Sequence, residues 1–296
     1  MEKEYQLLKF DKPLENEGEQ VLKIVESVEV VADQENVSWS FEDLKNEMMR
    51  SFEEAGSKAL EENKGTIFVT LSGGVDSTLG LAMLRKNFPE AKIVAFTMGG
   101  SEEHPDVIHA RLAAEKFGAE HREIIPNQDD IQEALKEYQK EFPDVDIEKA
   151  VADGDFDVYL LYKYISALQP KILVACDGID ELMGGYWGHR EGNTLEERKK
   201  AFEKFWGKLI PVHLQPLLAT GKRFNINLIF PYLNKKLVNI ISQIPIQDRV
   251  SDEVGKIPMR KLAKIFEVPD EIITRSKRGQ IGMLELEERR KIIFKD

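Results

Sequence analysis

Four short apolar runs alternate with helix-like segments between residues 66 and 176, and this alternation most constrains the fold. The runs have the length and β-branched content of buried strands, whereas the segments between them repeat apolar residues at helical spacing. The predicted strands are 66–71, 92–98, 120–125 and 171–176, and the predicted helices are 78–87, 104–118, 129–142 and 155–168. Because alternating strands and helices form parallel sheets covered on both faces, the sequence predicts an α/β core.

The segments that flank this core differ in character. Residues 40–63 are amphipathic, with Ser40 as the expected N-cap of a helix. Residues 5–10 and 21–32 favour short strands, and beyond Trp187 the strand signal fades and helical patterns take over. We therefore divide the chain into an N-terminal extension (1–39), an α/β core (40–190) and a helical C-terminal layer of the same domain (191–296).

Composition narrows the class of protein further. The 296-residue chain has 53 acidic and 41 basic side chains and a net charge of −12, which opposes binding to a nucleic acid. The single cysteine, Cys176, excludes an intramolecular disulfide and fits a reducing compartment. The N-terminus lacks the pattern of a signal peptide, and no run approaches the ~20 apolar residues of a membrane helix. We expect a cytoplasmic protein that does not bind a membrane.

The first predicted strand ends in the glycine-rich loop SGGVDS, residues 72–77, directly before a helix. Gly73 and Gly74 allow a tight turn whose backbone N–H groups can surround an anion, and the helix N-terminus adds positive charge. Ser72 and Ser77 add hydroxyl donors. The carboxylate of Asp76 repels a bare phosphate but suits a Mg²⁺ that phosphates share. An ordinary turn explains the glycines but not this carboxylate, so the loop predicts a pyrophosphate site with a metal.

A second loop follows the last predicted strand, in the segment KILVACDGIDELMGGYWG (171–188). SGGVDS resembles the pyrophosphate loop of the N-type ATP pyrophosphatases, and the second segment is similar to the asparagine synthetase pattern SGEGSDELFGGY. The residues that coincide with this pattern are Gly178, Asp180, Glu181, Leu182, Gly184, Gly185 and Tyr186. With similar segments at 96–124, 231–245 and 255–279, the resemblance to the asparagine synthetase–like synthetase domain covers roughly residues 41–282.

This resemblance implies a ligase that uses ATP to adenylate a carboxylate, releases pyrophosphate and transfers the acyl group to an amine. It implies a HUP-type fold, in which a five-stranded parallel sheet has helices on both faces and a helical C-terminal layer follows. The implied site consists of Ser72, Gly73, Gly74, Asp76 and Ser77 for the pyrophosphate; Asp76 and Asp180 for Mg²⁺; Leu71, Phe96, Thr97, Met98, Cys176 and Gly178 for the adenosine; and Asp177, Lys256 and Lys277 as catalytic residues.

The chain departs from this family pattern in three places. We expect no counterpart of the glutaminase domain, which begins with a cysteine after the initiator Met, since position 2 is Glu2 and the extension is short. We expect ammonia from solution, a separate glutaminase subunit, or another amine as the nitrogen source. Asp177 and Ile179 replace a Glu and a Ser of the family, and RSKRGQIGM replaces part of its tail. Aspartate is the default acid, and these changes leave its identity open.

Two other classes of function stay open at this point. A tRNA-modifying enzyme with the same type of loop could use Cys176 as a sulfur carrier, although the acidic charge and the single cysteine oppose it. A nucleotide-binding subunit that needs a partner for turnover is favoured by Asp177 and the altered tail. The sequence does not decide the oligomeric state, and a homo-oligomer is among the possibilities.

Overall fold

A computed structural model describes residues 16–31 and 39–275. Within these ranges five strands form one parallel sheet in the order β3-β2-β1-β4-β5. The strands are β1 (Thr66–Thr70), β2 (Lys92–Met98), β3 (Glu120–Ile124), β4 (Ile172–Val174) and β5 (Asn227–Ile229). The predicted α/β fold on a parallel sheet is therefore confirmed, and each of the four predicted strands ends within two residues of its expected limits.

The central strands are buried because both faces of the sheet are covered. β1 has three buried residues between two half-buried ends, and β2 is buried from Ile93 to Met98. The register pairs Val69 of β1 with Ala95 of β2 on one side and with Val174 of β4 on the other. Since all three strands run in the same direction, their carboxyl ends lie at one edge of the sheet.

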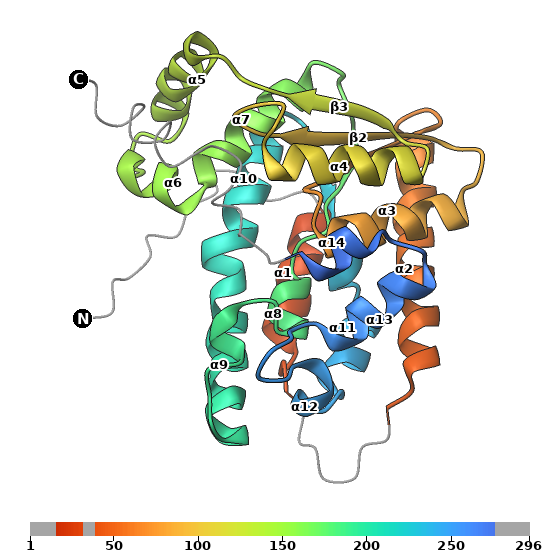
Figure 1. Ribbon diagram of the computed structural model, residues 1–296. Coiled ribbons are helices and arrows are strands. Elements are labelled where there is room, and N and C mark those ends of the chain that lie inside the picture. Colours follow the sequence, from red (N-terminus) through yellow and green to blue (C-terminus); the bar gives the residue numbers. More distant parts are fainter. Residues whose placement is uncertain (1–15, 32–38, 276–296) are drawn as a thin grey trace.

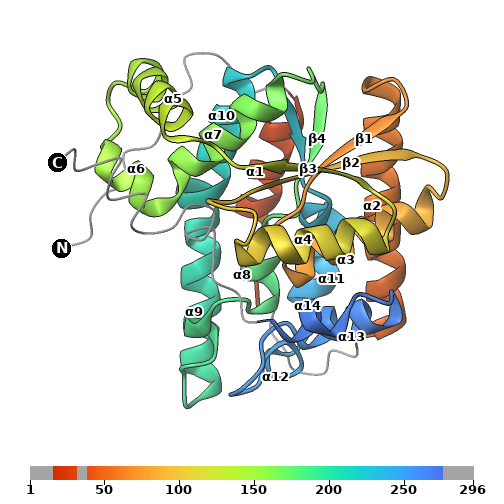
Figure 2. The ribbon, with the colours of Figure 1, turned by 45° about the horizontal axis from the view of Figure 1, so that its top comes forward.

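Helices pack on both faces of this sheet (Figure 2). One layer contains α2 (Phe41–Glu62), α3 (Val75–Asn87) and α4 (Pro105–Lys116), and the other contains α7 (Asp155–Ser166) and α10 (Gln215–Arg223), with α5 (Gln128–Glu141) against α7. Ser40 caps α2 as predicted, since its hydroxyl accepts the N–H of Asp43 at 3.1 Å. α3 begins three residues before its expected start, which puts Asp76 and Ser77 in its first turn.

The sheet has a switch point between β1 and β4. Along the chain, β2 and β3 are added on one side of β1, whereas β4 and β5 are added on the other. The connections that leave β1 and β4 therefore diverge, and ligands of open α/β sheets bind at such points, outside the carboxyl ends of the strands. Both loops singled out in the sequence leave from this point, since α3 follows β1 and α8 (Ile179–Met183) follows β4.

The part of the chain after α8 is mostly helical, as predicted (Figure 1). Its helical elements are η1 (Trp187–His189), α9 (Leu195–Lys208), the π-helical turn η2 (Leu209–Leu214), α10, η3 (Pro231–Leu233), α11 (Lys235–Ser242), α12 (Ile246–Arg249), α13 (Ile257–Ile265) and α14 (Asp270–Thr274). Among these helices, α11, α13 and α14 pack against α2, α3 and α8. No helix in the described ranges is both long and apolar enough to cross a membrane.

One expectation from the sequence is wrong. Most of 21–32, expected to be a strand, lies in helix α1 (Asn16–Ser27), because Val21 and Val25 are one helical turn apart and bury one face. The short strand β5 lies in the part of the chain where the strand signal fades, and it forms a strand by pairing with β4. Helix α6 (Ile147–Asp153) was not anticipated, and the strand expected at 5–10 lies outside the described residues.

A fully buried arginine joins the N-terminal segment to the C-terminal helices. The guanidinium of Arg249 donates to the carbonyls of Ile244 at 2.7 Å, Ser242 at 2.7 Å, Val30 at 2.8 Å and Leu182 at 3.1 Å. Burial lowers the pKa of Arg249 to about 9. Because Leu182 belongs to α8, this network also fixes the helix that follows the second loop.

Candidate functional site

The loop after β1 turns sharply at Gly73. This residue has a φ of +66°, and a Cβ added there would lie 2.6 Å from the backbone N of Ala110 and 2.7 Å from the carbonyl of Asp106. Any side chain would therefore collide with the first turns of α4, so the close approach of loop and helix requires glycine. Gly74 has an extended conformation, φ −87° and ψ 166°, and is the N-cap of α3. It leaves the first N–H groups of α3 without a side-chain cap.

The two serines of the loop contact each other. The Oγ atoms of Ser72 and Ser77 are 3.1 Å apart, and the backbone N–H of Ser72 donates to Ser77 Oγ at 3.1 Å. Arg275 closes the loop from the other side, since its guanidinium donates to the Gly73 carbonyl at 3.2 Å and forms an ion pair with Asp106. Carbonyls of the loop thus bind Arg275, and the hydroxyls and the helix N-terminus are the groups that suit an anion.

The residues expected near the adenosine come together at the ends of β1 and β2. The Leu71 N–H donates to the Phe96 carbonyl at 2.8 Å, and the Thr97 hydroxyl donates to the Leu71 carbonyl. The side chains of Leu71, Phe96, Thr97 and Met98 are all at most 3% exposed. These side chains are packed in the core below the strand ends. A ligand at this edge of the sheet would therefore contact the backbone of these residues more than their side chains.

The second loop needs its paired glycines for steric reasons. Gly178 and Gly184 bound α8 with φ values of +86° and +73°. A Cβ on the next residue, Gly185, would overlap the Asp180 carboxylate and the end of the Lys256 side chain. The Gly-Gly pair that the sequence shares with the asparagine synthetase pattern therefore makes room for a carboxylate and a lysine.

Lys256 lies between the two carboxylates expected to hold Mg²⁺. Its ammonium group forms ion pairs with Asp76, from the first turn of α3, and with Asp180, from α8. The side chains of Lys256, Asp76 and Asp180 are 5%, 13% and 9% exposed. Lys256 also has a φ of +57°, which is uncommon for a residue with a side chain. The structure thus brings three predicted site residues into one cluster.

The same cluster fits a divalent metal. Among the described residues, Asp76 Oδ1 is buried and has no hydrogen-bond partner, and both carboxylates reach one point, where the Lys256 ammonium lies. Two carboxylates are a typical protein contribution to Mg²⁺, which keeps other ligands for water and phosphate. No group of three or more metal-ligating side chains occurs in the described part of the chain. The donor set therefore suits a metal shared with phosphates rather than a closed metal site.

The structure gives Asp177 a partner that the sequence analysis missed. The imidazole Nε2 of His213 lies 2.8 Å from Asp177 Oδ1, and the side chains are 16% and 22% exposed. His213 is carried by η2, the π-helical turn between α9 and α10. π-helical turns occur often at functional sites.

Acidic groups control the protonation of His213. Burial by itself lowers the pKa of the imidazole, but the hydrogen bond to Asp177 and the charges of Asp177, Glu181 and Asp155 outweigh burial and raise that pKa to about 9. Burial and the charge of Asp153 raise the pKa of Asp155 to about 7, against the opposing charge of His213. Beside the Lys256 cluster there is thus a second cation among carboxylates, and this one can exchange a proton.

Cys176 precedes Asp177 in the chain and is a poor nucleophile. Burial raises the pKa of its thiol well above the usual value, and the charges of Asp177 and Asp76 raise it further. A Cβ added at Gly80 would lie 2.6 Å from Cys176 Sγ, so the thiol packs closely against α3. Since thiolate is the reactive form, this environment opposes the sulfur-carrier alternative.

Two further residues concern the predicted site: Lys277, which was predicted as catalytic, and Tyr232, which was not singled out. Lys277 lies outside the described residues. Tyr232, in a segment quoted for its family resemblance, donates its hydroxyl to the Asp76 carbonyl at 2.9 Å and holds the start of α3. The signal for Tyr232 was present in the segment PYLNKK, whereas a lone histidine in an amphipathic helix gave no signal for His213.

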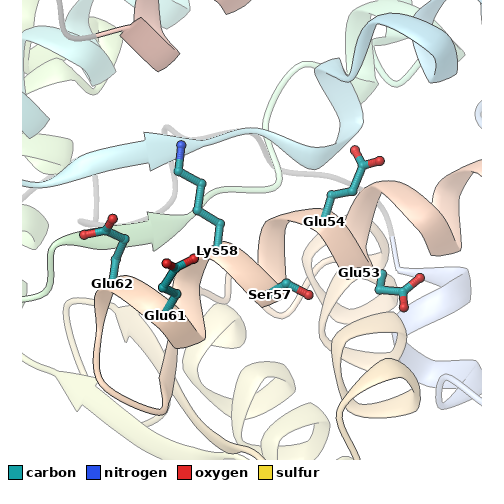
Figure 3. A pocket seen from close by; sticks show the side chains of 6 residues that line it. All are labelled: Glu53, Glu54, Ser57, Lys58, Glu61 and Glu62. Atoms are coloured by element: carbon teal, nitrogen blue, oxygen red, sulfur yellow. The ribbon is translucent and has the colours of Figure 1, made fainter.

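A surface hollow on α2 (Figure 3) shares no lining residue with these clusters. Side chains of a single helix line it, and four of them are carboxylates. The lining residues are Glu53, Glu54, Ser57, Lys58, Glu61 and Glu62. Because no other element contributes a lining side chain, we do not consider it the functional site.

The fold and the two loops define an α/β protein with a phosphate-type loop at the switch point of its sheet. A family model described as asparagine synthase matches residues 49–224 and 219–285. These ranges contain most of the chain, which therefore belongs to the asparagine synthase family.

Curated relatives include glutamine-hydrolyzing asparagine synthetases. The human protein is 27% identical over 248 residues, which are 81% of this chain and 43% of that protein. The chicken protein is 28% identical over 248 residues, which again are 81% of this chain and 43% of that protein. The chain thus spans less than half the length of these relatives.

Solved structures with a similar arrangement are more distant. NMN synthetase from Francisella tularensis has a TM-score of 0.45 at 16% identity and covers 86% of this chain and 85% of its own. The NH3-dependent NAD synthetase from Campylobacter jejuni has a TM-score of 0.41 at 16% identity, with coverages of 79% and 76%.

Proposed function

We propose that this protein is an ATP-dependent ligase that joins a carboxylate to ammonia or another amine and forms AMP and pyrophosphate. The observation that carries the proposal is the meeting of Asp76 and Asp180 at one ammonium group, directly beside the loop of residues 72–77. Paired carboxylates next to an anion-binding loop suit a nucleotide triphosphate with Mg²⁺. Membership of the asparagine synthase family supports the same reaction type.

In the first half-reaction, the substrate carboxylate attacks the α-phosphorus of ATP, and pyrophosphate leaves. The N–H groups at the start of α3 and the hydroxyls of Ser72 and Ser77 would hold the β- and γ-phosphates. Lys256 supplies a cation where charge develops on the leaving pyrophosphate, which lowers the barrier. Mg²⁺, when bound by Asp76 and Asp180, would add a Lewis acid to this charge neutralisation.

In the second half-reaction, an amine displaces AMP from the acyl-adenylate. Asp177 lies three residues after the end of β4 and three residues before Asp180, at the position of the catalytic Glu in the family pattern. Because the Asp177 side chain is shorter than the Glu of the family pattern, either the substrate lies closer to it or a further side chain takes part in this step. Aspartate is the default acid substrate of the proposal, and ammonium is the default nitrogen donor.

Product analysis tests the proposal directly. The protein is incubated with ATP, Mg²⁺, ammonium and either aspartate or one of a panel of amino and dicarboxylic acids, and AMP and pyrophosphate are quantified. We expect acid-dependent formation of both in equal amounts. Asp180→Asn should abolish it, and Glu61→Gln, in the hollow on α2, should not change it. A folded protein that binds ATP but forms neither product with any acid would contradict the proposal.

The nitrogen source needs a separate comparison. With a productive acid, we expect ammonium to support amide formation and glutamine alone to support none, because the two described clusters contain no candidate for glutamine hydrolysis. Adding a stand-alone glutaminase together with glutamine should restore amide formation. If AMP forms only after a partner protein is added, the partner-dependent alternative is favoured instead.

A further inference from the structure

The pair formed by His213 and Asp177 has no role in adenylation as described above. We infer that His213 is the general base that removes a proton from the attacking amine, and that Asp177 is the positioning residue that orients its ring. The inference rests on the proposed ligase function and adds a catalytic residue to its second half-reaction.

The geometry of the pair supports this division of roles. Asp177 Oδ1 accepts the Nε2–H of His213 at 2.8 Å, so the second ring nitrogen, Nδ1, is the one that can take a proton from a ligand. A carboxylate that binds one imidazole nitrogen fixes the tautomer and orientation of the ring, as in the catalytic triads of hydrolases. Asp177 belongs to the loop after β4, three residues beyond its end, so the pair stands at the same sheet edge as the Lys256 cluster.

The backbone that carries His213 is a specific arrangement. Residues Leu209–Leu214 form a π-helical turn within an otherwise continuous run from α9 to α10. Pro211 lies in this turn and lacks a backbone N–H, which interrupts regular helical hydrogen bonding. A wider turn changes which face of the run the following residues occupy, and within it His213 contacts Asp177.

The charges around the imidazole come from three elements. Asp177 belongs to the loop after β4, Glu181 to α8 and Asp155 to the N-terminus of α7, and Tyr162 of α7 also lies near Asp177. Glu181 accepts the hydroxyl of Tyr186 at 2.8 Å, while its Oε2 is buried without a partner among the described residues. Acidic surroundings attract a basic amine and stabilise the imidazolium formed when the ring takes a proton.

The proposed step is balanced. The amine nitrogen forms a bond to the acyl carbon of the adenylate, and the bond between that carbon and the AMP oxygen breaks, so AMP leaves as an anion. One proton passes from the amine nitrogen to neutral His213 at Nδ1, and water takes it from there. The base form of His213 becomes more abundant as the pH rises toward 9, so this step should accelerate with pH over that range.

Two assays on the full chain separate the half-reactions. Exchange of labelled pyrophosphate into ATP, with the productive acid and Mg²⁺ but without amine, reports adenylation. Conversion of the preformed adenylate to a hydroxamate reports the amine step. Hydroxylamine is the probe because its conjugate acid is far more acidic than ammonium, so its own titration does not distort the pH profile.

His213→Gln and Asp177→Asn are the informative variants. His213→Gln retains a side-chain N–H for Asp177 but has no base, so we expect hydroxamate formation to fall about 100-fold and its rise toward pH 9 to disappear. Pyrophosphate exchange should stay within about twofold of the wild type. Asp177→Asn should move the rise to lower pH, because the charge that raises the pKa of His213 is lost.

Each other outcome overturns the inference in a recognisable way. If His213→Gln forms hydroxamate at the wild-type rate, or loses exchange and hydroxamate formation equally, His213 is not the base. If the wild type shows no exchange with any acid, the ligase proposal fails and this inference with it. Should His213→Gln not fold, NMR titration of His213 in the wild type and Asp177→Asn decides, and an unchanged titration midpoint contradicts the pairing.

Discussion

Two buried cations bind carboxylates at the same sheet edge, and they differ in what they can do. Lys256 bridges Asp76 and Asp180, which follow different strands, whereas His213 pairs with Asp177 alone. An ammonium group only donates hydrogen bonds, so Lys256 can neutralise anions or be displaced from the two carboxylates by a metal ion. An imidazole exchanges a proton near neutral pH. The Lys256 cluster is thus suited to neutralising charge, and the His213 cluster is suited to transferring a proton.

The largest effect should come from removing the Lys256 charge. Lys256→Met leaves two largely buried carboxylates without their cation while the side chain keeps most of its apolar length. Breaking a buried ion pair on one side typically costs about 3 kcal/mol or more, so we expect such a loss in the free energy of unfolding. Urea denaturation without Mg²⁺ measures it. Added Mg²⁺ should restore part of the loss, because it can bind the same two carboxylates.

Lys264→Met is the matched control, because Lys264 lies on the exposed side of α13, the helix that begins directly after Lys256. It should change the stability by less than about 0.5 kcal/mol and show no specific response to Mg²⁺. If both variants behaved alike, Lys256 would not be the counter-ion of the metal carboxylates. The contrast between a charge-holding and a proton-moving cluster would then be lost.

A smaller effect should appear in the pH dependence of stability. The folded-state pKa of His213, about 9, lies above the usual 6.5, so the folded state binds the proton more tightly. The resulting stability is fully present below pH 6.5 and is lost as the pH rises through 9. We expect a loss on the order of 3 kcal/mol over that window. Thermal or urea unfolding at a series of pH values measures it.

His213→Gln should remove the alkaline part of this profile. A second loss of folding stability, as the pH rises from about 4 to 7, should persist in this variant. Its cause is Asp155, whose pKa is raised from 3.8 to about 7, so that its ionisation destabilises the folded state. Equal slopes above pH 7 in the wild type and in His213→Gln would show that the imidazole is not held as a cation.

The two clusters also differ in how well the sequence predicted them. The Asp76–Asp180 pair was predictable, because both residues follow parallel strands and carboxyl ends of such strands share an edge. The role of Lys256 came from family resemblance, and the structure places it beside both carboxylates. The glycines at 73 and 185 were predicted as part of motifs, and their contacts with α4 and with Asp180 give the physical reason.

The His213 cluster could not be predicted. His213 lies 36 residues after Asp177 and contacts it from a π-helical turn. Local patterns predict periodic helices and strands but not an interruption of helical register. Local patterns were also insufficient for β5 and α1. The three residues of β5 form a strand by pairing with the edge of β4. The segment of α1 was predicted as a strand because valines favour strands locally. Long-range partners decided each of these cases.

The smallest predicted effect concerns Tyr232, which fixes the backbone of Asp76. Tyr232→Phe keeps the ring and its edge contact with Phe52, whose centroid is 5.0 Å away, but removes the hydrogen bond to the Asp76 carbonyl. We expect a loss of about 1 kcal/mol in the free energy of unfolding. We also expect weaker binding of Mg²⁺–ATP, by about twofold to threefold, because Asp76 is then less firmly oriented.

Tyr164→Phe provides the matched control, since the Tyr164 hydroxyl donates to Asp130 at 2.8 Å away from both clusters. It should cost a similar amount of stability and leave Mg²⁺–ATP binding unchanged, as measured by calorimetric titration. The hydroxamate assay should not distinguish the two variants, because neither touches His213. A change in hydroxamate formation in Tyr232→Phe, at unchanged nucleotide affinity, would mean that the two clusters are coupled and that charge holding and proton transfer are not separable.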